Sequence, residues 1–532
     1  MILIQKIKSQ FISLFFGIFT VCLTSTAEAA SRITFNLIPF GQFQIKVADL
    51  EAFVATGAKT PELDYYLRRL DSEQLEQLPT LLTTPLDLHP LAIANFSNSQ
   101  IGAITIANFA KGIRVRQNRN GFYALRGAII AAAFDESQLT ILNLLRHYPL
   151  ETIDLDLALL NQYFQQANRL TQNRQEIKRT WFDSESATAL SEDSHKGHSA
   201  PQDLGLYTWQ KRTLQYDNPR RPQKGLFDLY QPNIDRPVPL IAISHGIASN
   251  RQTFAYLGQH FASHGFAVAV VEHSEISLDK FDRFLAGKAA FPDGQNLINN
   301  PLDISSVLDR LESEPNLDLE RVGVVGQSFG GYTALALSGG KLFADQTAAE
   351  CQTENFDRVL LNLSSLAQCT FNQLGQSSVQ LRDPRIKAAI AINPMGGLFG
   401  KRGINSVETP TMIISGTHDP IMPAVDEQIE PFVWLDPSLE KYLVLIEPGT
   451  HFSFLQEGLG VLPVPDTDVG PRPVYAYPVL KALGTSFFQL HLAQQLEYQV
   501  YLQEDRAVQL NSDAFKLAII RSLAESELEQ FP

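Results

Sequence analysis

The stretch Gly326-Gln327-Ser328-Phe329-Gly330-Gly331 decides the fold of this chain. Residues 321–325 before it are mostly apolar and β-branched, which predicts a buried strand, and residues 333–337 after it predict a packed helix. The intervening G-x-S-x-G pattern is typical of a sharp strand–turn–helix elbow that holds up a serine hydroxyl. Glycine is needed on both sides because a Cβ would collide where the strand and the helix crowd together. We therefore predict that Ser328 is a nucleophile at a helix N-terminus, where the helix dipole favours developing negative charge.

The composition fits a globular protein with a large core. The 532 residues are 44% hydrophobic and 19% charged, which is enough chain for two or three domains. The net charge is −14, and the sequence has neither a basic block nor a basic arm. Nucleic acid is therefore not expected as a partner, and the charge mainly predicts solubility.

Residues 1–29 are expected to be a signal peptide. Lys6 and Lys8 precede an apolar stretch, 11–23, that is too short to span a bilayer comfortably. Ala27-Glu28-Ala29 then supplies the small residues that a signal peptidase needs. The alternative is an uncleaved membrane anchor. We expect an exported protein, periplasmic or extracellular, with contact to the membrane or envelope left open.

The mature chain would keep two cysteines, Cys351 and Cys369. In an oxidising compartment this even pair is expected to form one disulfide. Closing a loop of that size would contribute about 3 kcal/mol if unstrained. Two buried unpaired thiols are the alternative, and two ligands alone do not predict a metal site.

Three regions follow the signal peptide. Residues 30–180 predict a small, mostly α-helical domain that begins with a hairpin, 33–37 and 42–47. Residues 181–204 are rich in Ser, Asp and Ala without a hydrophobic period, which indicates a flexible linker. Residues 205–532 predict a catalytic domain.

In that domain, predicted strands alternate with predicted helices. An antiparallel edge pair is expected first, and the row of parallel-type strands comprises 238–244, 266–272, 321–325, 386–392, 410–415 and 441–446. The last helices are expected at 479–495 and 513–524. This order predicts an α/β fold with a doubly wound, mostly parallel sheet, helices on both faces, and ligands at the carboxyl ends of the strands.

An acid and a histidine follow the last predicted strands in the required order. A serine hydroxyl needs a base to take its proton, and the base needs a third group to orient it. The strand 410–415 leads into a turn with Asp419, and the strand 441–446 ends just before His451. Because parallel strands end at one edge of the sheet, we predict a triad of Ser328, His451 and Asp419.

Competing residues are less well placed. His418 adjoins the acid and precedes the last strand, so it is a less favoured candidate for the catalytic base. The alternative acids are Asp303, Asp345 and Glu447.

The oxyanion hole is expected to consist of backbone N–H groups. His245 follows a central strand and would shape the loop, so that the N–H of Ile247 and the N–H of Phe329 converge on the anionic oxygen. Losing such a donor costs about 3 kcal/mol in the transition state. Because the main chain supplies it, the identity of residue 247 is poorly constrained.

Residues 205–532 resemble an α/β-hydrolase, and within that superfamily the platelet-activating-factor acetylhydrolase and dienelactone-hydrolase-like group. The residues that carry the resemblance are Ser244-His245-Gly246, Ala262-Ser263-His264-Gly265-Phe266, Val271-Glu272-His273 and the elbow with Tyr332. The N-terminal part, with Ile33-Thr34-Phe35 and Val47-Ala48-Asp49-Leu50, is similar to an uncharacterised helical domain that precedes such hydrolases in cyanobacteria.

Two departures from these families matter. Dienelactone hydrolases use cysteine at the elbow, so Ser328 points to ester chemistry. Some acetylhydrolases carry their acid after the preceding strand, where this chain has Asn393, and an amide cannot replace that carboxylate. The role therefore falls to Asp419.

The prediction is an exported serine hydrolase that cleaves small-molecule or lipid carboxylic esters through an acyl-enzyme, without cofactor or metal. A lipase or a phospholipase A2-like acetylhydrolase, active in lipid degradation, is the nearest alternative, and a non-catalytic envelope-binding protein is another. The segments 277–300, 339–383 and 457–477 are expected to overhang Ser328 as lids or specificity walls. The oligomeric state is not predicted.

Overall fold

The computed structural model describes residues 30–37, 39, 41–86, 88–115, 119–183, 200–350, 362–456 and 469–531. The chain divides into two compact units, Met1–Gln162 and Tyr163–Pro532. This division falls inside helix α9 (Leu157–Trp181), so the C-terminal part of that helix belongs to the second unit. The predicted signal peptide, 1–29, lies outside the described residues, as do residues 184–199 of the predicted linker. Among the residues described, no helix is long and apolar enough to cross a membrane.

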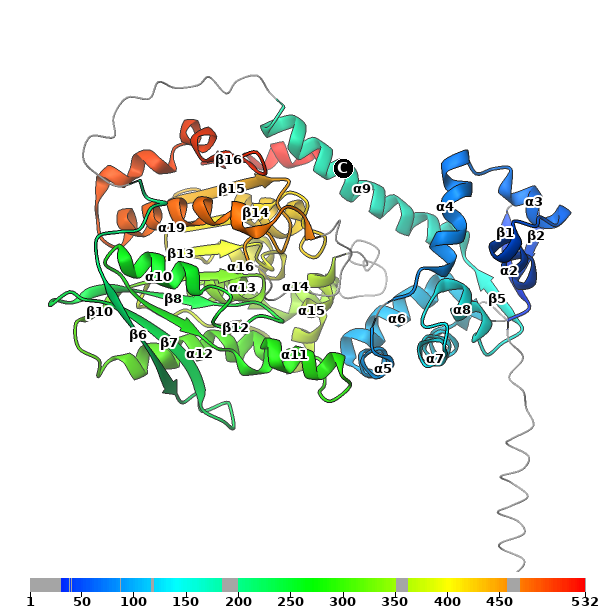
Figure 1. Cartoon of the computed structure of the whole chain (residues 1–532), viewed down its shortest axis with the longest axis horizontal. Coiled ribbons are helices and arrows are strands. Elements are labelled where there is room, and N and C mark those ends of the chain that lie inside the picture. The colour runs from blue at the N-terminus through cyan, green and yellow to red at the C-terminus, as the bar shows by residue number, and fades with distance from the viewer. Residues whose placement is uncertain are drawn as a thin grey trace, which may run out of the picture. The chain divides into compact units, whose positions relative to one another are not determined.

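The N-terminal unit combines a five-stranded sheet with short helices (Figure 1). Its strand order is β2-β1-β5-β3-β4, and β1 pairs antiparallel with β2 across the predicted hairpin. The strands are β1 (Arg32–Leu37), β2 (Gly41–Lys46), β3 (Ile113–Val115), β4 (Arg119–Asn120) and β5 (Thr152–Leu155). The helices are α2 (Val47–Thr56), α3 (Pro61–Leu67), α4 (Ser72–Thr83), α5 (Pro90–Asn98), α6 (Gln100–Gly112), α7 (Phe122–Ala133) and α8 (Ile141–Arg146). The sequence did not predict β3, β4 and β5, because such short strands carry too little alternation to be recognised.

The C-terminal unit is built on a nine-stranded sheet in the order β16-β15-β14-β13-β10-β8-β9-β7-β6. The run from β15 to β9 is parallel, and the edge strands β16, β7 and β6 pair antiparallel. The strands are β6 (Trp209–Tyr216), β7 (Gly225–Pro232), β8 (Val238–Ser244), β9 (Ala267–Val271), β10 (Leu317–Gln327), β13 (Ile386–Ile392), β14 (Thr411–Gly416), β15 (Lys441–Glu447) and β16 (Lys516–Ile520). A separate two-stranded sheet consists of β11 (Lys341–Phe343) and β12 (Ser378–Gln380). The predicted fold class is confirmed.

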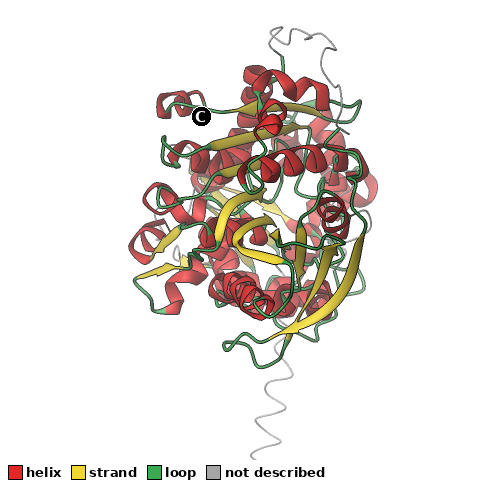
Figure 2. Ribbon diagram, turned by 90° about the vertical axis from the view of Figure 1, so that its left-hand side faces the viewer, coloured by secondary structure: helices red, strands yellow, loops and turns green. Residues whose placement is uncertain are grey.

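Helices cover both faces of the large sheet, as Figure 2 shows. The helices of this unit are α10 (Ala255–Ser263), α11 (Leu278–Leu285), α12 (Asn296–Leu311), α13 (Phe329–Leu337), α14 (Ala344–Glu350), α15 (Leu363–Phe371), α16 (Gly400–Ile404), α17 (Glu430–Trp434) and α19 (Tyr477–His491). Alternate residues of the central strands enter different cores. Ile241 and Ile243 join a cluster with α10 and α19, whereas Leu240 and Ala242 pack with α12. Side chains on both faces of β8 are thus buried, which explains its continuous apolar sequence.

The C-terminal end of α9 is anchored in the second unit. Ile177 is 1% exposed and belongs to the larger core cluster. The ring of Trp181 stacks on Phe531 with centroids 6.0 Å apart. Residues 163–180 are therefore part of the C-terminal unit, although the sequence predicts them in the N-terminal helical domain.

The helix predicted at 513–524 is wrong. Residues 516–520 form the edge strand β16, which pairs antiparallel with β15 from Leu443↔Ile520 to Glu447↔Lys516. Leu517 and Ile519 are buried on this strand. Pairing with an open sheet edge overrides the weak local helix preference of so short an apolar run.

Candidate active site

Ser328 lies at a sharp elbow between β10 and α13. Its backbone angles are φ 58° and ψ −118°, a conformation that is rare for a residue with a side chain. Its N–H donates to the carbonyl of Ile392 on neighbouring β13 at 2.9 Å, and its own carbonyl accepts from the N–H of Tyr332 at 3.1 Å. The second bond begins α13. The elbow is thus held from both the sheet and the helix.

The glycines around Ser328 are required by close backbone contacts. A Cβ on Gly326 would lie 1.8 Å from the carbonyl oxygen of Gly330. A Cβ on Gly330 would lie 2.0 Å from the carbonyl oxygen of Ser244, at the end of β8. Atoms this close overlap, so a side chain at either position would break the elbow.

Asp419 and His451 form a buried hydrogen-bonded pair. Oδ2 of Asp419 lies 2.7 Å from Nδ1 of His451. The other carboxylate oxygen, Oδ1, accepts the backbone N–H groups of Ile421 and Met422, each at 2.8 Å. The side chain of Asp419 is fully buried, and that of His451 is 7% exposed. Because Asp419 can only accept when ionised, Nδ1 of His451 carries a proton and Nε2 is the basic nitrogen.

Gln327 brings His451 to the elbow. The side-chain Nε2 of Gln327 donates to the carbonyl oxygen of His451 at 3.2 Å and lies 3.3 Å from Nε2 of its ring. Gln327 directly precedes Ser328, so the basic nitrogen of His451 lies against the residue next to the predicted nucleophile. No sequence pattern singles out Gln327, because it occupies the variable position of G-x-S-x-G.

Two backbone N–H groups beside Ser328 have no acceptor among the described residues. Gly246 is so near the elbow that a Cβ on it would lie 2.9 Å from Cβ of Ser328. The N–H of the next residue, Ile247, and the N–H of Phe329 donate to no protein atom within the described part of the chain. Free donors beside a nucleophile suit a developing oxyanion.

A hydrogen-bond relay lies behind the loop that carries Ile247. It consists of Ser244, His273, Asp303 and Arg221, and the first three of these side chains are fully buried. Oγ of Ser244 is 2.8 Å from Nε2 of His273, and Nδ1 of His273 is 2.9 Å from Oδ2 of Asp303. Arg221 completes the relay by donating to Asp303 from Nε at 2.7 Å. Burial favours a raised pKa for Asp303, but the bonds from His273 and Arg221 prevail and lower its pKa. The relay therefore keeps a carboxylate in the interior.

The relay also fixes His245, which opens the loop that carries Ile247. The N–H of His273 donates to Nε2 of His245 at 3.0 Å, and Nδ1 of His245 bonds to the carbonyl of Gly246 at 2.8 Å. Burial, reinforced by His273, lowers the pKa of His245 to about 3, so its ring is neutral. The sequence predicts Asp303 only as an alternative acid. It does not predict the relay, because the four residues are far apart in the chain.

The competing residues are engaged elsewhere. Nδ1 of His418 lies 3.3 Å from Glu447, and the ring is 38% exposed. Asp345 pairs with Arg402 on the surface at 3.2 Å.

Asn393 joins the two loops that carry the acid and the histidine. Its Oδ1 accepts the N–H of Gly416 at 2.8 Å, and its Nδ2 donates to the carbonyl of Thr450 at 3.2 Å. Gly416 ends the strand before Asp419, and Thr450 directly precedes His451. Asn393 cannot act as the acid, but its buried side chain holds together the loops that carry Asp419 and His451.

Side chains from two of the predicted lid segments, 277–300 and 339–383, are buried in the C-terminal unit. Phe281 and Phe284 of α11 are buried, with ring centroids 5.8 Å apart. The carboxylate of Glu427 accepts from Nδ2 of Asn362, at the start of α15, at 2.6 Å. Burial raises the pKa of Glu427 to about 7. Residues 351–361 and 457–468 of the predicted lids lie outside the described residues.

The predicted disulfide stays a prediction. Cys369 is buried in α15, whereas Cys351 lies outside the described residues. Within the described ranges, no cluster of three or more His, Cys, Asp or Glu side chains could hold a metal ion.

Two family models match the chain. Residues 29–156 match a family described as an alpha/beta hydrolase of unknown function, and this match covers most of the N-terminal unit. Residues 220–281 match platelet-activating factor acetylhydrolase, isoform II, and cover β8, α10 and β9.

Curated relatives are distant and matched only in part. Cutinase 2 of Thermobifida cellulosilytica is 24% identical over 225 residues, which is 42% of this chain and 64% of that protein. Cutinase cut1 of Thermobifida fusca is 24% identical over 225 residues, or 53% of its length. Cutinase est1 of Thermobifida alba is 25% identical over 228 residues, or 57% of its length. The chain thus spans between half and two thirds of the length of these relatives.

Proposed function

Because the chain belongs to the α/β-hydrolase superfamily, we propose that its C-terminal unit is a serine hydrolase that cleaves carboxylic esters through an acyl-enzyme. The substrates are small-molecule or lipid esters. The observation that carries the proposal is the 2.7 Å bond between Asp419 and His451, with Nε2 of that imidazole beside the elbow of Ser328. This arrangement supports the proposal, because a serine becomes a nucleophile only beside a base that a third group orients.

In the first half of the proposed reaction, Oγ of Ser328 attacks the ester carbonyl carbon and gives its proton to Nε2 of His451. The carbonyl electrons move to the oxygen, and the N–H groups of Ile247 and Phe329 bind this oxyanion. Asp419 holds the protonated Nδ1 and stabilises the imidazolium. The C–O bond to the alcohol then breaks, and His451 donates its new proton to the leaving oxygen.

In the second half, water replaces the alcohol. His451 takes a proton from the water, and the hydroxide oxygen attacks the acyl carbon. The bond to Oγ of Ser328 breaks, Oγ recovers its proton from His451, and the carboxylic acid leaves. The proton of Ser328 leaves with the alcohol and a proton from water replaces it, so the enzyme ends in its starting protonation state.

Hydrolysis of p-nitrophenyl acetate by the purified chain tests this proposal. The wild type should release p-nitrophenol catalytically, and Ser328→Ala should reduce the rate by at least 10³-fold, as expected when the nucleophile of such a triad is removed. Ser486→Ala, which removes a buried hydroxyl on α19, is the matched control and should keep the wild-type rate. No turnover by a folded wild type would favour a binding protein on the same fold instead.

A narrower candidate is an acetylhydrolase that acts on phospholipid. It is favoured by the match of residues 220–281 to the platelet-activating factor acetylhydrolase family. Release of acetate from micelles of a phospholipid acetylated at sn-2, compared with release from soluble short-chain esters, separates the two candidates. A rate that rises at the critical micelle concentration would support the lipid substrate.

We also propose export, based on residues 1–29. Expression of the full gene in a bacterial host, followed by mass spectrometry of the N-terminal peptide, tests this. A mature protein that begins at Ala30 is expected in the exported fraction, and an intact N-terminus in the membrane fraction would instead indicate an anchor.

A further inference from the structure

A cavity of about 460 Å³ lies at the edge of the large sheet opposite to Ser328. Val238 begins β8 in its wall, and Phe266 directly precedes β9. Ser244, at the other end of β8, belongs to the relay behind the oxyanion loop. A strand rises about 3.3 Å per residue, so about 20 Å of sheet separates the two ends of β8. The cavity is therefore not the catalytic pocket.

The wall of this cavity is positively charged in an acidic protein. Its lining includes Arg236 and Arg321 but no Asp or Glu, although the chain has a net charge of −14. Arg236 is exposed and makes no ion pair or hydrogen bond within the described part of the chain. Arg321 donates from Nε to Asp318 at 2.7 Å and from Nη1 to the carbonyl of Leu492 at 3.3 Å. The guanidinium of Arg236 is thus the uncompensated charge, and it favours an anion.

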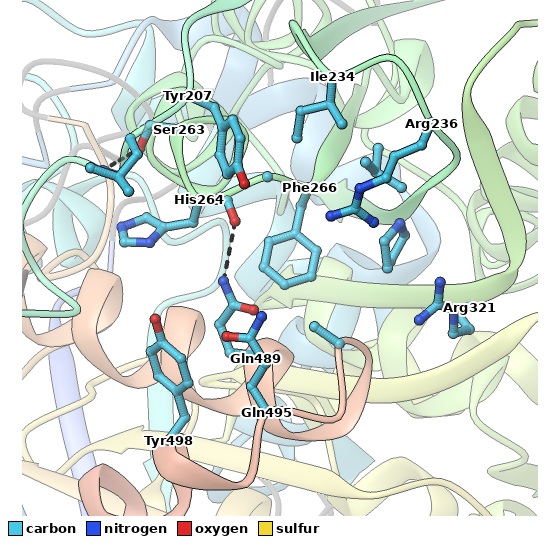
Figure 3. Close-up of a pocket in the computed structure, with 16 residues that line it drawn as sticks. Tyr207, Ile234, Arg236, Ser263, His264, Phe266, Arg321, Gln489, Gln495 and Tyr498 are labelled. Carbon is cyan, nitrogen blue, oxygen red and sulfur yellow. Dashed lines mark hydrogen bonds between the residues drawn. The ribbon is translucent and has the colours of Figure 1, made fainter. Parts of the chain in front are cut away.

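The rest of the lining suits an apolar body. Figure 3 shows the ring of Phe266 near the centre of the group, with Tyr207, Ile234 and Arg236 along one side. Tyr498 brings a hydroxyl from the opposite side, from the 3-10 helix Leu496–Leu502. Aromatic and aliphatic walls with few polar groups are typical of sites for small organic ligands, and the volume is in their usual range.

Exposed leucines flank the same cavity. Leu206, which lines it, is 89% exposed, and Leu496, which follows the lining residue Gln495, is 72% exposed. Exposed leucines beside an unpaired arginine match a ligand with both a charged group and an alkyl chain.

We propose that this cavity binds an amphipathic organic carboxylate, such as a medium-chain fatty acid. The carboxylate pairs with the guanidinium of Arg236, which offers two parallel N–H donors. The alkyl chain lies against Phe266 and Ile234 and extends toward Leu206. The proposal does not depend on ester hydrolysis, because none of these residues belongs to the catalytic edge.

Isothermal titration calorimetry of sodium octanoate with the full chain tests the site. The wild type should show a saturable site whose Kd rises at least tenfold in Arg236→Glu. Arg283→Glu makes the same change of charge at another exposed arginine, on α11, and should leave that Kd unchanged. Because the side chains of Arg236 and Arg283 are exposed and make no ion pair or hydrogen bond with the described residues, both variants should melt like the wild type. Equal octanoate binding by the wild type and Arg236→Glu would overturn the proposal.

Two further probes test the chemistry of the ligand. Octanol carries the chain without the charge, and inorganic phosphate carries charge without a chain, so both should bind at least tenfold more weakly than octanoate. Phosphate binding as tight as octanoate binding would contradict an amphipathic ligand. A diazirine-labelled fatty acid should crosslink to peptides that contain Tyr207 or Tyr498, and crosslinks confined to other peptides would overturn the location.

Discussion

The side-chain nitrogen of Gln327 lies 3.2 Å from the carbonyl oxygen of His451 and 3.3 Å from Nε2 of its ring. The first bond fixes the backbone of the histidine, and the second contact directs its basic nitrogen toward the residue before Ser328. Because a carbonyl can only accept, the nitrogen of the amide must face His451. The residue before the nucleophile is thus a positioning residue for the base.

Replacing Gln327 should slow the chemical step without unfolding the protein. Gln327→Leu keeps the volume but removes both contacts with His451, so kcat for p-nitrophenyl acetate should fall about tenfold, or about 1.4 kcal/mol of transition-state free energy. KM should change little, because Gln327 is proposed to act on His451 and not on the bound substrate. Gln489→Leu removes another buried amide that bonds to a backbone carbonyl, that of His264, and should leave kcat unchanged. Equal kcat values for both variants would show that Gln327 does not position the base.

Asp419→Asn should abolish activity and preserve the fold. The amide oxygen can still accept the N–H groups of Ile421 and Met422, but the amide nitrogen favours the wrong tautomer of His451. In serine proteases this change lowers kcat by about 10⁴-fold, and a similar loss is expected here. His418→Asn, at the neighbouring exposed histidine, should retain nearly full kcat. The reverse pattern would make His418 the base.

Asn393→Ala should destabilise the folded protein. It removes the bonds to Gly416 and Thr450 and places alanine at φ 41°. An unsatisfied buried N–H and a strained backbone together are worth about 2–4 kcal/mol. Urea unfolding measures the loss, and Asn405→Ala at an exposed site should cost less than about 0.5 kcal/mol. A loss as small as that of Asn405→Ala would exclude Asn393 as a brace.

The pKa of Asp303 predicts a pH-dependent stability. Because this pKa is lower in the folded state than in the unfolded state, the ionised carboxyl contributes stability above the unfolded pKa of about 3.9. That contribution is lost as pH falls through the folded pKa. Asp303→Asn should lower the free energy of unfolding by about 3–5 kcal/mol at pH 7, because the charge of Arg221 loses its ionised partner.

The size of this difference should depend on pH. Urea unfolding of the wild type and Asp303→Asn at pH 7 and near pH 3 measures it, and the two proteins should be closer in stability at the lower pH. Ser306→Ala, about one turn from Asp303 on the same helix, should show no comparable dependence. A constant difference across this range would mean that the carboxyl is not ionised in the folded protein.

Buried parallel strands were predicted well from the sequence. The predicted bounds of β8 and β13 agree with the structure, because strands covered on both faces are continuous apolar runs. The elbow glycines were also predictable, since backbone crowding leaves room only for hydrogen.

Other features depend on contacts that the sequence does not display. The sequence predicts a helix where the edge strand β16 lies, because an apolar segment of that length fits either structure until its partner β15 is known. The bond between His273 and Asp303 joins residues 30 positions apart, and the role of Gln327 depends on a histidine 124 positions away. No local pattern reveals such pairs.

Labelling with a fluorophosphonate, followed by peptide mass spectrometry, tests the proposed nucleophile most directly. The phosphonyl group should be found on the peptide that contains Ser328, and labelling should be lost in Ser328→Ala and strongly slowed in His451→Ala. Labelling of Ser328→Ala at the wild-type rate, or an adduct on another serine, would contradict the account.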